Sequence, residues 1–87
     1  MRKVYDFYAD PGHGWLKVNI KDLRELGIEN KITGASYKNK DNVYLEEEWD
    51  ATQFINAYKN KYGYNIKVNF HSGNKRSRIR NYQDYQI

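Results

Sequence analysis

The 87-residue sequence has no cysteine, one proline and no long run of apolar residues. Without cysteine there is no disulfide and no thiolate ligand, and two histidines are too few for a zinc site. No stretch approaches the roughly 18 consecutive apolar residues that span a bilayer. The N-terminus turns acidic within six residues and has no apolar segment of the secretory type. We therefore expect a protein of a reducing, cytoplasmic compartment with no membrane partner.

Signatures of common enzyme classes are missing as well. The chain has no Walker loop, no GxGxxG, no GxSxG and no HExxH. Its densest acidic run is Glu46–Glu48, followed by Asp50. Consecutive carboxylates on a strand alternate between its faces, so these do not converge on a metal ion. They favour the positive N-terminus of a following helix or clamp a basic segment. We expect no cofactor, no metal site and no catalytic residue.

Aromatic residues and a local excess of positive charge stand out instead. The chain holds nine tyrosines, three phenylalanines and two tryptophans, and its net charge is +4. Residues 1–70 carry eleven Lys and Arg against ten Asp and Glu, whereas residues 71–87 carry four against one. Most of the excess therefore lies in the last fifth of the chain.

The apolar periodicity predicts one small α+β domain over residues 1–70, in the order β-β-α-β-β-α-β. We expect a mainly antiparallel sheet with two helices on one face. The strands are expected over residues 3–8, 15–18, 32–37, 43–47 and 66–70. The first helix follows Asn19 and ends at Gly27, and the second begins at Asp50 and ends at Gly63.

The second helix has the stronger local signals. Asp50 with Gln53 three residues later fits a capping box, in which Asp50 is the N-cap. Trp49 before the cap and Phe54 after it fit a hydrophobic staple.

Residues 71–87 are predicted to form a basic C-terminal arm, either extended or as a short helix. In an extended chain, Arg76, Arg78 and Arg80 lie on one side, where guanidinium groups match phosphates or carboxylates. Tyrosines beside them can stack on unpaired bases or pack on a protein. The alternative is a solvated tail, or a tail that folds back on Glu46–Glu48. The candidate partner-binding residues of this arm are Lys75, Arg76, Arg78, Arg80 and Tyr82.

The turn Asp10–Trp15 offers further candidates. Glycines on both sides of His13 expose its ring at a loop tip, beside Trp15. In a functional interpretation, His13 is a base or a phosphate contact. The preferred interpretation is an ordinary hairpin loop, in which the glycines serve the turn and the histidine is incidental. His13 and His71 together would suit acid–base cleavage of RNA, a lesser alternative that no spacing supports.

Three runs together resemble a family of small proteins carried by bacterial phages, prophages and plasmids. They are DPGHGWLKV at 10–18, VYLEEEWDATQF at 43–54 and SRIRNY at 77–82. The resemblance implies a mobile-element origin in a bacterial host cell, and it carries no catalytic role. Small proteins of that origin often bind host machinery, including nucleic-acid-guided defence systems.

The function expected from residues and resemblance is therefore binding without catalysis. The partner is nucleic acid or a host nucleoprotein complex, engaged by the arginine-rich arm. The alternative is an anti-defence inhibitor, of the anti-CRISPR type, that binds a host protein directly. Monomer and dimer are both open.

Overall fold

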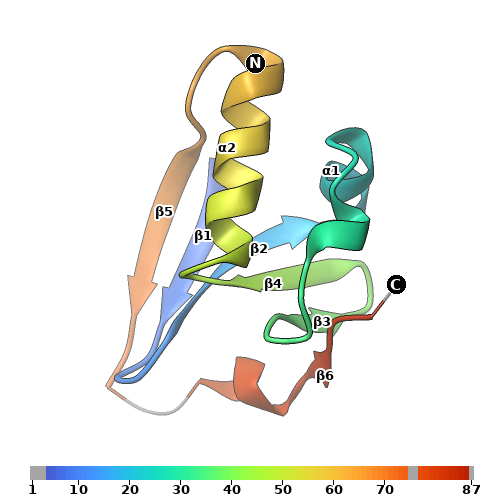
Figure 1. Ribbon diagram of the computed structural model, residues 1–87. Helices are drawn as coiled ribbons and strands as arrows, with labels where there is room; N and C mark the ends of the chain where they lie inside the picture. The colour runs from blue at the N-terminus through green and yellow to red at the C-terminus, as the bar shows by residue number, and fades with distance from the viewer. Residues whose placement is uncertain (1–3, 75–76, 87) are drawn as a thin grey trace.

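The protein folds as a six-stranded sheet with both helices on one face (Figure 1). The computed structural model describes residues 4–74 and 77–86. In chain order its elements are β1 (Val4–Ala9), β2 (Gly14–Asn19), α1 (Ile20–Glu25), the 3₁₀ turn η1 (Glu29–Lys31), β3 (Tyr37–Asn39), β4 (Asn42–Glu46), α2 (Asp50–Tyr62), β5 (Lys67–Ser72), the 3₁₀ turn η2 (Arg78–Asn81) and β6 (Gln83–Asp84). The small α+β class is confirmed.

The strands are ordered β5-β1-β2-β4-β3-β6 across the sheet. Four neighbouring pairs are antiparallel, and β1 with β5 is parallel. The parallel pair arises because α2 carries the chain from β4 back across the sheet, as such a connection requires. Neither helix in the described part of the chain is long and apolar enough to cross a membrane.

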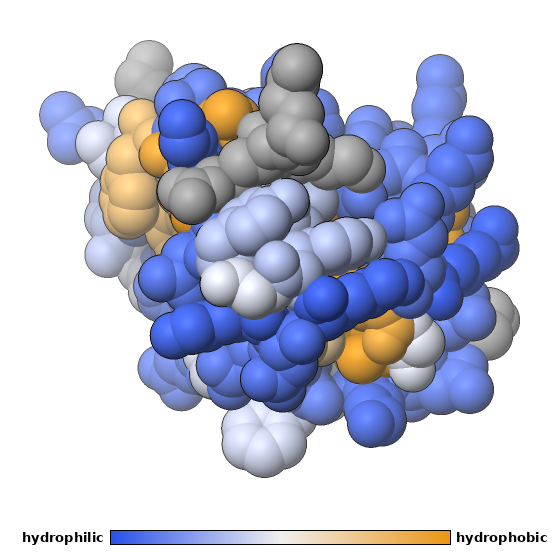
Figure 2. Space-filling view, turned by 90° about the horizontal axis from the view of Figure 1, so that it is seen from above, coloured by the Kyte–Doolittle hydropathy of each residue, from blue (hydrophilic) through white to orange (hydrophobic). Residues whose placement is uncertain are grey.

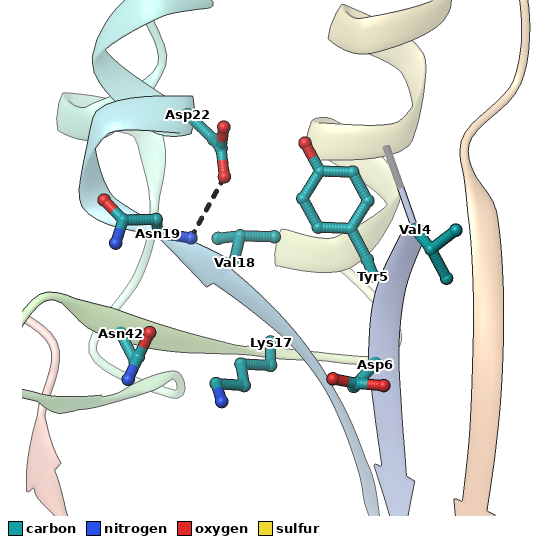
Figure 3. Close-up of a pocket in the computed structure, with 8 residues that line it drawn as sticks. All are labelled: Val4, Tyr5, Asp6, Lys17, Val18, Asn19, Asp22 and Asn42. Carbon is teal, nitrogen blue, oxygen red and sulfur yellow. Dashed lines mark hydrogen bonds between the residues drawn. The ribbon is translucent and has the colours of Figure 1, made fainter. Parts of the chain in front are cut away.

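The main core lies between the sheet and the two helices. Tyr5 of β1 meets Phe54 and Tyr58 of α2 edge to face, at ring-centroid distances of 5.3 and 6.1 Å. Figure 3 shows Tyr5 pointing toward the helices, while Asp6 and Lys17 lie on the opposite side of the sheet. Because successive residues alternate between the faces, the sheet has one apolar face that packs on the helices and a second face that carries charged side chains such as Asp6 and Lys17.

The ends of α1 are as expected. The Asn19 side chain accepts a hydrogen bond from the first turn, and the Asp22 carboxylate accepts one from the Asn19 backbone. Gly27 has φ +67°, and the Ile28 N–H donates to the Leu23 carbonyl. The helix has only six residues, so these caps and the burial of Leu23 hold it in place.

The expected capping of α2 is wrong. Trp49 occupies the N-cap position without a side-chain bond and is 64% exposed, so it does not staple onto Phe54. Glu46 caps the helix instead, because its carboxylate accepts bonds from the backbone N–H groups of Glu48, Trp49 and Asp50. The expected role of this acidic run at the helix N-terminus thus falls to Glu46.

Asp50 is drawn away from capping by a buried network. Its side chain is fully buried and accepts hydrogen bonds from the Thr33 N–H and hydroxyl and from the Ser36 hydroxyl. The Ser36 oxygen also accepts from the Glu46 N–H at 3.0 Å. This network fastens the loop before β3 to the start of α2.

The C-terminal residues are part of the sheet, which corrects the expected boundary between residues 70 and 71. That boundary falls inside β5, and the C-terminal segment, residues 77–86, folds back on the domain (Figure 1). Ile79 and Tyr85 are each only 4% exposed, and β6 pairs with β3. The Tyr85 hydroxyl donates to the Glu29 carbonyl at 2.7 Å. Lys75 and Arg76 lie outside the described residues.

We expect Asp50→Asn to lower the free energy of unfolding by about 2–3 kcal/mol, because the buried donors lose a charged acceptor. Urea denaturation measures the change. Asp41→Asn, in an exposed turn, is the matched control and should stay within about 0.5 kcal/mol of the wild type. Equal effects of the two substitutions would contradict this role of Asp50.

Candidate functional site

The face of the sheet turned away from the helices carries an aromatic cluster. Successive strand residues point to opposite faces, so β2 and β4 place Trp15 and Tyr44 on this side. Ile79 of the C-terminal segment is buried in the same cluster. The cluster consists of Trp15, Tyr44 and Ile79, with Tyr8, Tyr37 and Tyr82 partly buried around them.

Asp10 attaches the C-terminal segment to this face. Its carboxylate accepts hydrogen bonds from the backbone N–H groups of Gly12, His13 and Ser77 at 2.9–3.0 Å. It also accepts two from Arg80, from Nε at 2.7 Å and from Nη2 at 2.9 Å. Arg80, followed by the Ser77 N–H, holds the pKa of Asp10 well below its usual range and outweighs the opposing effect of burial.

Arg80 is therefore a structural residue and not a free contact for a partner. Its guanidinium lies over the Trp15 ring, 5.4 Å from the centroid, and Nη2 donates to His13 Nδ1 at 2.9 Å. A Cβ at Gly12 would lie 2.9 Å from Arg80 Nη2, so a larger residue there would displace the end of the arginine side chain.

A first cleft of about 240 Å³ opens beside this contact. Its lining residues are His13, Trp15, Ala35, Tyr37, Glu46, Glu47, Glu48 and Arg80. Arg80 is neutralised by Asp10, and the lining carboxylates outnumber it. The pKa of Glu46 is lowered, because its three backbone donors overcome burial. The charge of this cleft opposes an anion.

A second cleft, of about 210 Å³, lies between the C-terminal segment and the sheet. Its lining residues are Tyr8, Lys17, Tyr44, Ser77, Arg78, Ile79 and Tyr82. We call it the tyrosine–cation cleft. Two residues of its lining are cationic, and none of the described residues that line it is acidic. Its electrostatic character is thus opposite to that of the first cleft.

The hydroxyls of Tyr8 and Tyr44 are protonated at neutral pH. The Tyr44 and Tyr82 ring centroids are 5.1 Å apart, and those of Tyr8 and Tyr44 are 6.4 Å apart. Burial, then Tyr82, raises the pKa of Tyr44 to about 12. Burial, then Asp6, raises the pKa of Tyr8. The charge of Arg78 acts in the lowering direction on both pKa values, but burial outweighs it.

The two histidines are engaged in different contacts. The His71 ring stacks on Tyr8 at 4.8 Å, and its Nε2 lies 3.0 Å from Asp6 Oδ1. The His13 ring stacks on Trp15 at 6.1 Å and is bonded to Arg80. Each imidazole therefore has one ring nitrogen already occupied.

The structure divides the expected site residues between the two clefts. It brings His13, Trp15 and Arg80 together in the first, and Arg78 and Tyr82 together in the second. Sequence reasoning missed Tyr8, Lys17 and Tyr44. The alternation of residues along each strand predicts which face Tyr8, Lys17 and Tyr44 occupy. It does not predict that the C-terminal segment covers that face, so the cleft could not be predicted.

Comparisons with protein-family models, curated proteins and solved structures find no match to this chain.

We expect Asp10→Asn to lower the melting temperature at pH 7, with an effect that shrinks in acid. The folded-state pKa of Asp10 is below the unfolded value, so its stabilisation is present above about pH 4 and is lost as pH falls further. Thermal unfolding of both proteins from pH 7 to pH 2 measures the difference. Arg80→Lys, which keeps the charge but not the forked geometry, should also be less stable at pH 7. A pH-independent difference between Asp10→Asn and wild type would contradict the assignment.

Proposed function

We propose that this protein is a non-catalytic binding module that engages nucleic acid, alone or within a host nucleoprotein complex, through the tyrosine–cation cleft. The observation that carries the proposal is the grouping of Lys17 and Arg78 with three tyrosine rings on one face of the sheet. Cations contact phosphates, and aromatic rings stack on exposed bases.

The shape of the site favours a single strand. Tyr8 and Tyr82 are half-buried, so each presents part of its ring, while Tyr44 is almost wholly covered. Bases within a duplex are stacked on one another and cannot use such a surface, whereas unpaired bases can. Tyr8, Lys17 and Tyr44 come from neighbouring strands of the sheet, and Arg78 and Tyr82 come from the C-terminal segment that lies over them.

The charge distribution favours a placed contact over general adhesion to polyanions. Arg80, one of the expected contacts, is bonded to Asp10 and adds little to the external field. Arg78 is exposed and adjoins the cleft. Among the residues that line this cleft, the positive charge comes from Arg78 and Lys17.

A second candidate is a protein-directed inhibitor, in keeping with the resemblance to mobile-element proteins and with an anti-CRISPR-type role. Trp49 is 64% exposed and Phe70 is 72% exposed, and large exposed apolar residues are typical of interface hot spots. Figure 2 shows hydrophobic residues gathered at the side of the molecule that carries β5. A host complex retained after nuclease treatment, and lost in Trp49→Ala or Phe70→Ala, would favour this candidate.

A small ribonuclease that uses His13 and His71 is the least supported candidate, since each ring is held in a separate contact. Incubation of labelled RNA with wild type and His13→Ala tests it. Absent or unchanged cleavage removes it.

We expect Arg78→Ala and Lys17→Ala each to weaken binding of a single-stranded oligonucleotide. Each lost phosphate contact should reduce the slope of log affinity against log salt by about 0.7. Fluorescence anisotropy at several salt concentrations measures both effects. Lys59→Ala, an exposed cation on α2, is the matched control. Loss of affinity equal to that of the control, with an unchanged slope, would refute the proposed surface.

A further inference from the structure

The tyrosine–cation cleft gathers more hydrogen-bond donors than base stacking requires. Four hydroxyl-bearing residues line it, Tyr8, Tyr44, Tyr82 and Ser77, together with the cations Lys17 and Arg78. A hydroxyl is a neutral donor that can turn toward an acceptor, and an ammonium or guanidinium is a charged donor. The lining is therefore rich in donors and in positive charge.

We propose that this cleft is a recognition site for a phosphoryl group, in which tyrosine hydroxyls and the side chains of Lys17 and Arg78 surround the phosphate oxygens. This inference rests on the proposed function and names the group that the cleft reads. A phosphoryl group presents several acceptor oxygens with negative charge, so it complements a lining of hydroxyls and cations.

The aromatic packing supports this assignment over a pure stacking role. Tyr44 is 7% exposed, so its ring faces are covered by neighbours and unavailable to a base. The Tyr44 and Tyr82 rings pack against each other at an interplanar angle of 44°. The raised pKa values of Tyr8 and Tyr44 keep these two hydroxyls protonated, so both remain donors.

The acidic groups near the cleft each have other partners. Asp6 lies opposite Lys17 in the β1–β2 register and offsets part of its charge, and its Oδ1 is also 3.0 Å from His71 Nε2. Asp10 is occupied by Arg80 and by three backbone donors. The carboxylates of residues 46–48 line the other cleft. The two clefts beside the C-terminal segment thus differ in charge, and an anion is attracted to the tyrosine–cation cleft.

The same chemistry has two sources in nucleic acid. A backbone diester has two non-bridging oxygens and one negative charge, whereas a terminal monoester has three oxygens and up to two charges. A volume of about 210 Å³ admits a phosphoryl group together with part of its sugar. The experiment therefore compares both sources.

The test uses the full chain and three probes, which are inorganic phosphate, an unphosphorylated oligothymidine and the same strand with a 5′-phosphate. Two-dimensional amide NMR maps where phosphate binds, and calorimetry gives oligonucleotide affinities. Tyr44→Phe and Tyr82→Phe keep the rings but remove the hydroxyls. Tyr62→Phe, on α2, is the matched control.

We expect inorganic phosphate to shift the amide signals of Lys17 and Arg78, and each cleft variant to weaken oligonucleotide binding about tenfold. A gain from the 5′-phosphate that disappears in the variants assigns the monoester. Equal losses for both strands assign the diester. Unchanged thermal melting of the variants separates these losses from unfolding.

Two results overturn one proposal without the other. If oligonucleotides bind and Arg78→Ala weakens them, but the cleft variants behave like Tyr62→Phe, the phosphoryl site is wrong and the proposed function stands. If no oligonucleotide binds, yet phosphate shifts the cleft signals and the cleft variants abolish those shifts, the proposed function is wrong and the phosphoryl site stands.

Discussion

The carboxylate of Asp10 joins the β1–β2 loop to the C-terminal segment. It receives bonds from the β1–β2 loop on one side and from Ser77 and Arg80 on the other. Arg78 and Tyr82 belong to the same short segment as Arg80, so their position over the sheet follows from this one anchor. Ile79, buried in the aromatic cluster, adds apolar contact to the same segment. Both clefts exist because the segment is held there.

Carboxylates serve as hubs for backbone and hydroxyl donors throughout this small domain. Glu46 gathers the first N–H groups of α2, and Asp50 gathers Thr33 and Ser36. A chain of this length buries a modest core, so irregular segments gain little from apolar packing alone. Charged acceptors compensate, since hydrogen bonds to charged groups are stronger than neutral ones. The same use of Asp10 removes Arg80 from the surface charge.

Local signals predicted local structure well and distant contacts poorly. The caps of α1 lie within a few residues of the helix, so Asn19 and Gly27 were identified correctly. Asp50 had the right spacing for a cap, yet its partners are 14 and 17 residues away in the chain. Arg80 was assigned to a partner because Asp10, 70 residues earlier, gives no sign of the pairing. Ile79 is a single apolar residue among polar neighbours, so no periodic pattern indicated that it would be buried.

The number of cationic residues in a sequence overstates how many can bind a partner, because some form ion pairs within the protein. Arg78 and Arg80 are two residues apart, but one lies in an anion-favouring cleft and the other is bonded to a carboxylate. The short 3₁₀ turn that contains both places Arg80 in the lining of the first cleft and Arg78 in the lining of the tyrosine–cation cleft. A partner that recognises the described surface therefore meets a small set of donors whose backbones are held against the sheet. The side chains of Arg78 and Lys17 still lose rotamer freedom on binding, so selectivity comes from the geometry of the cleft as much as from its charge.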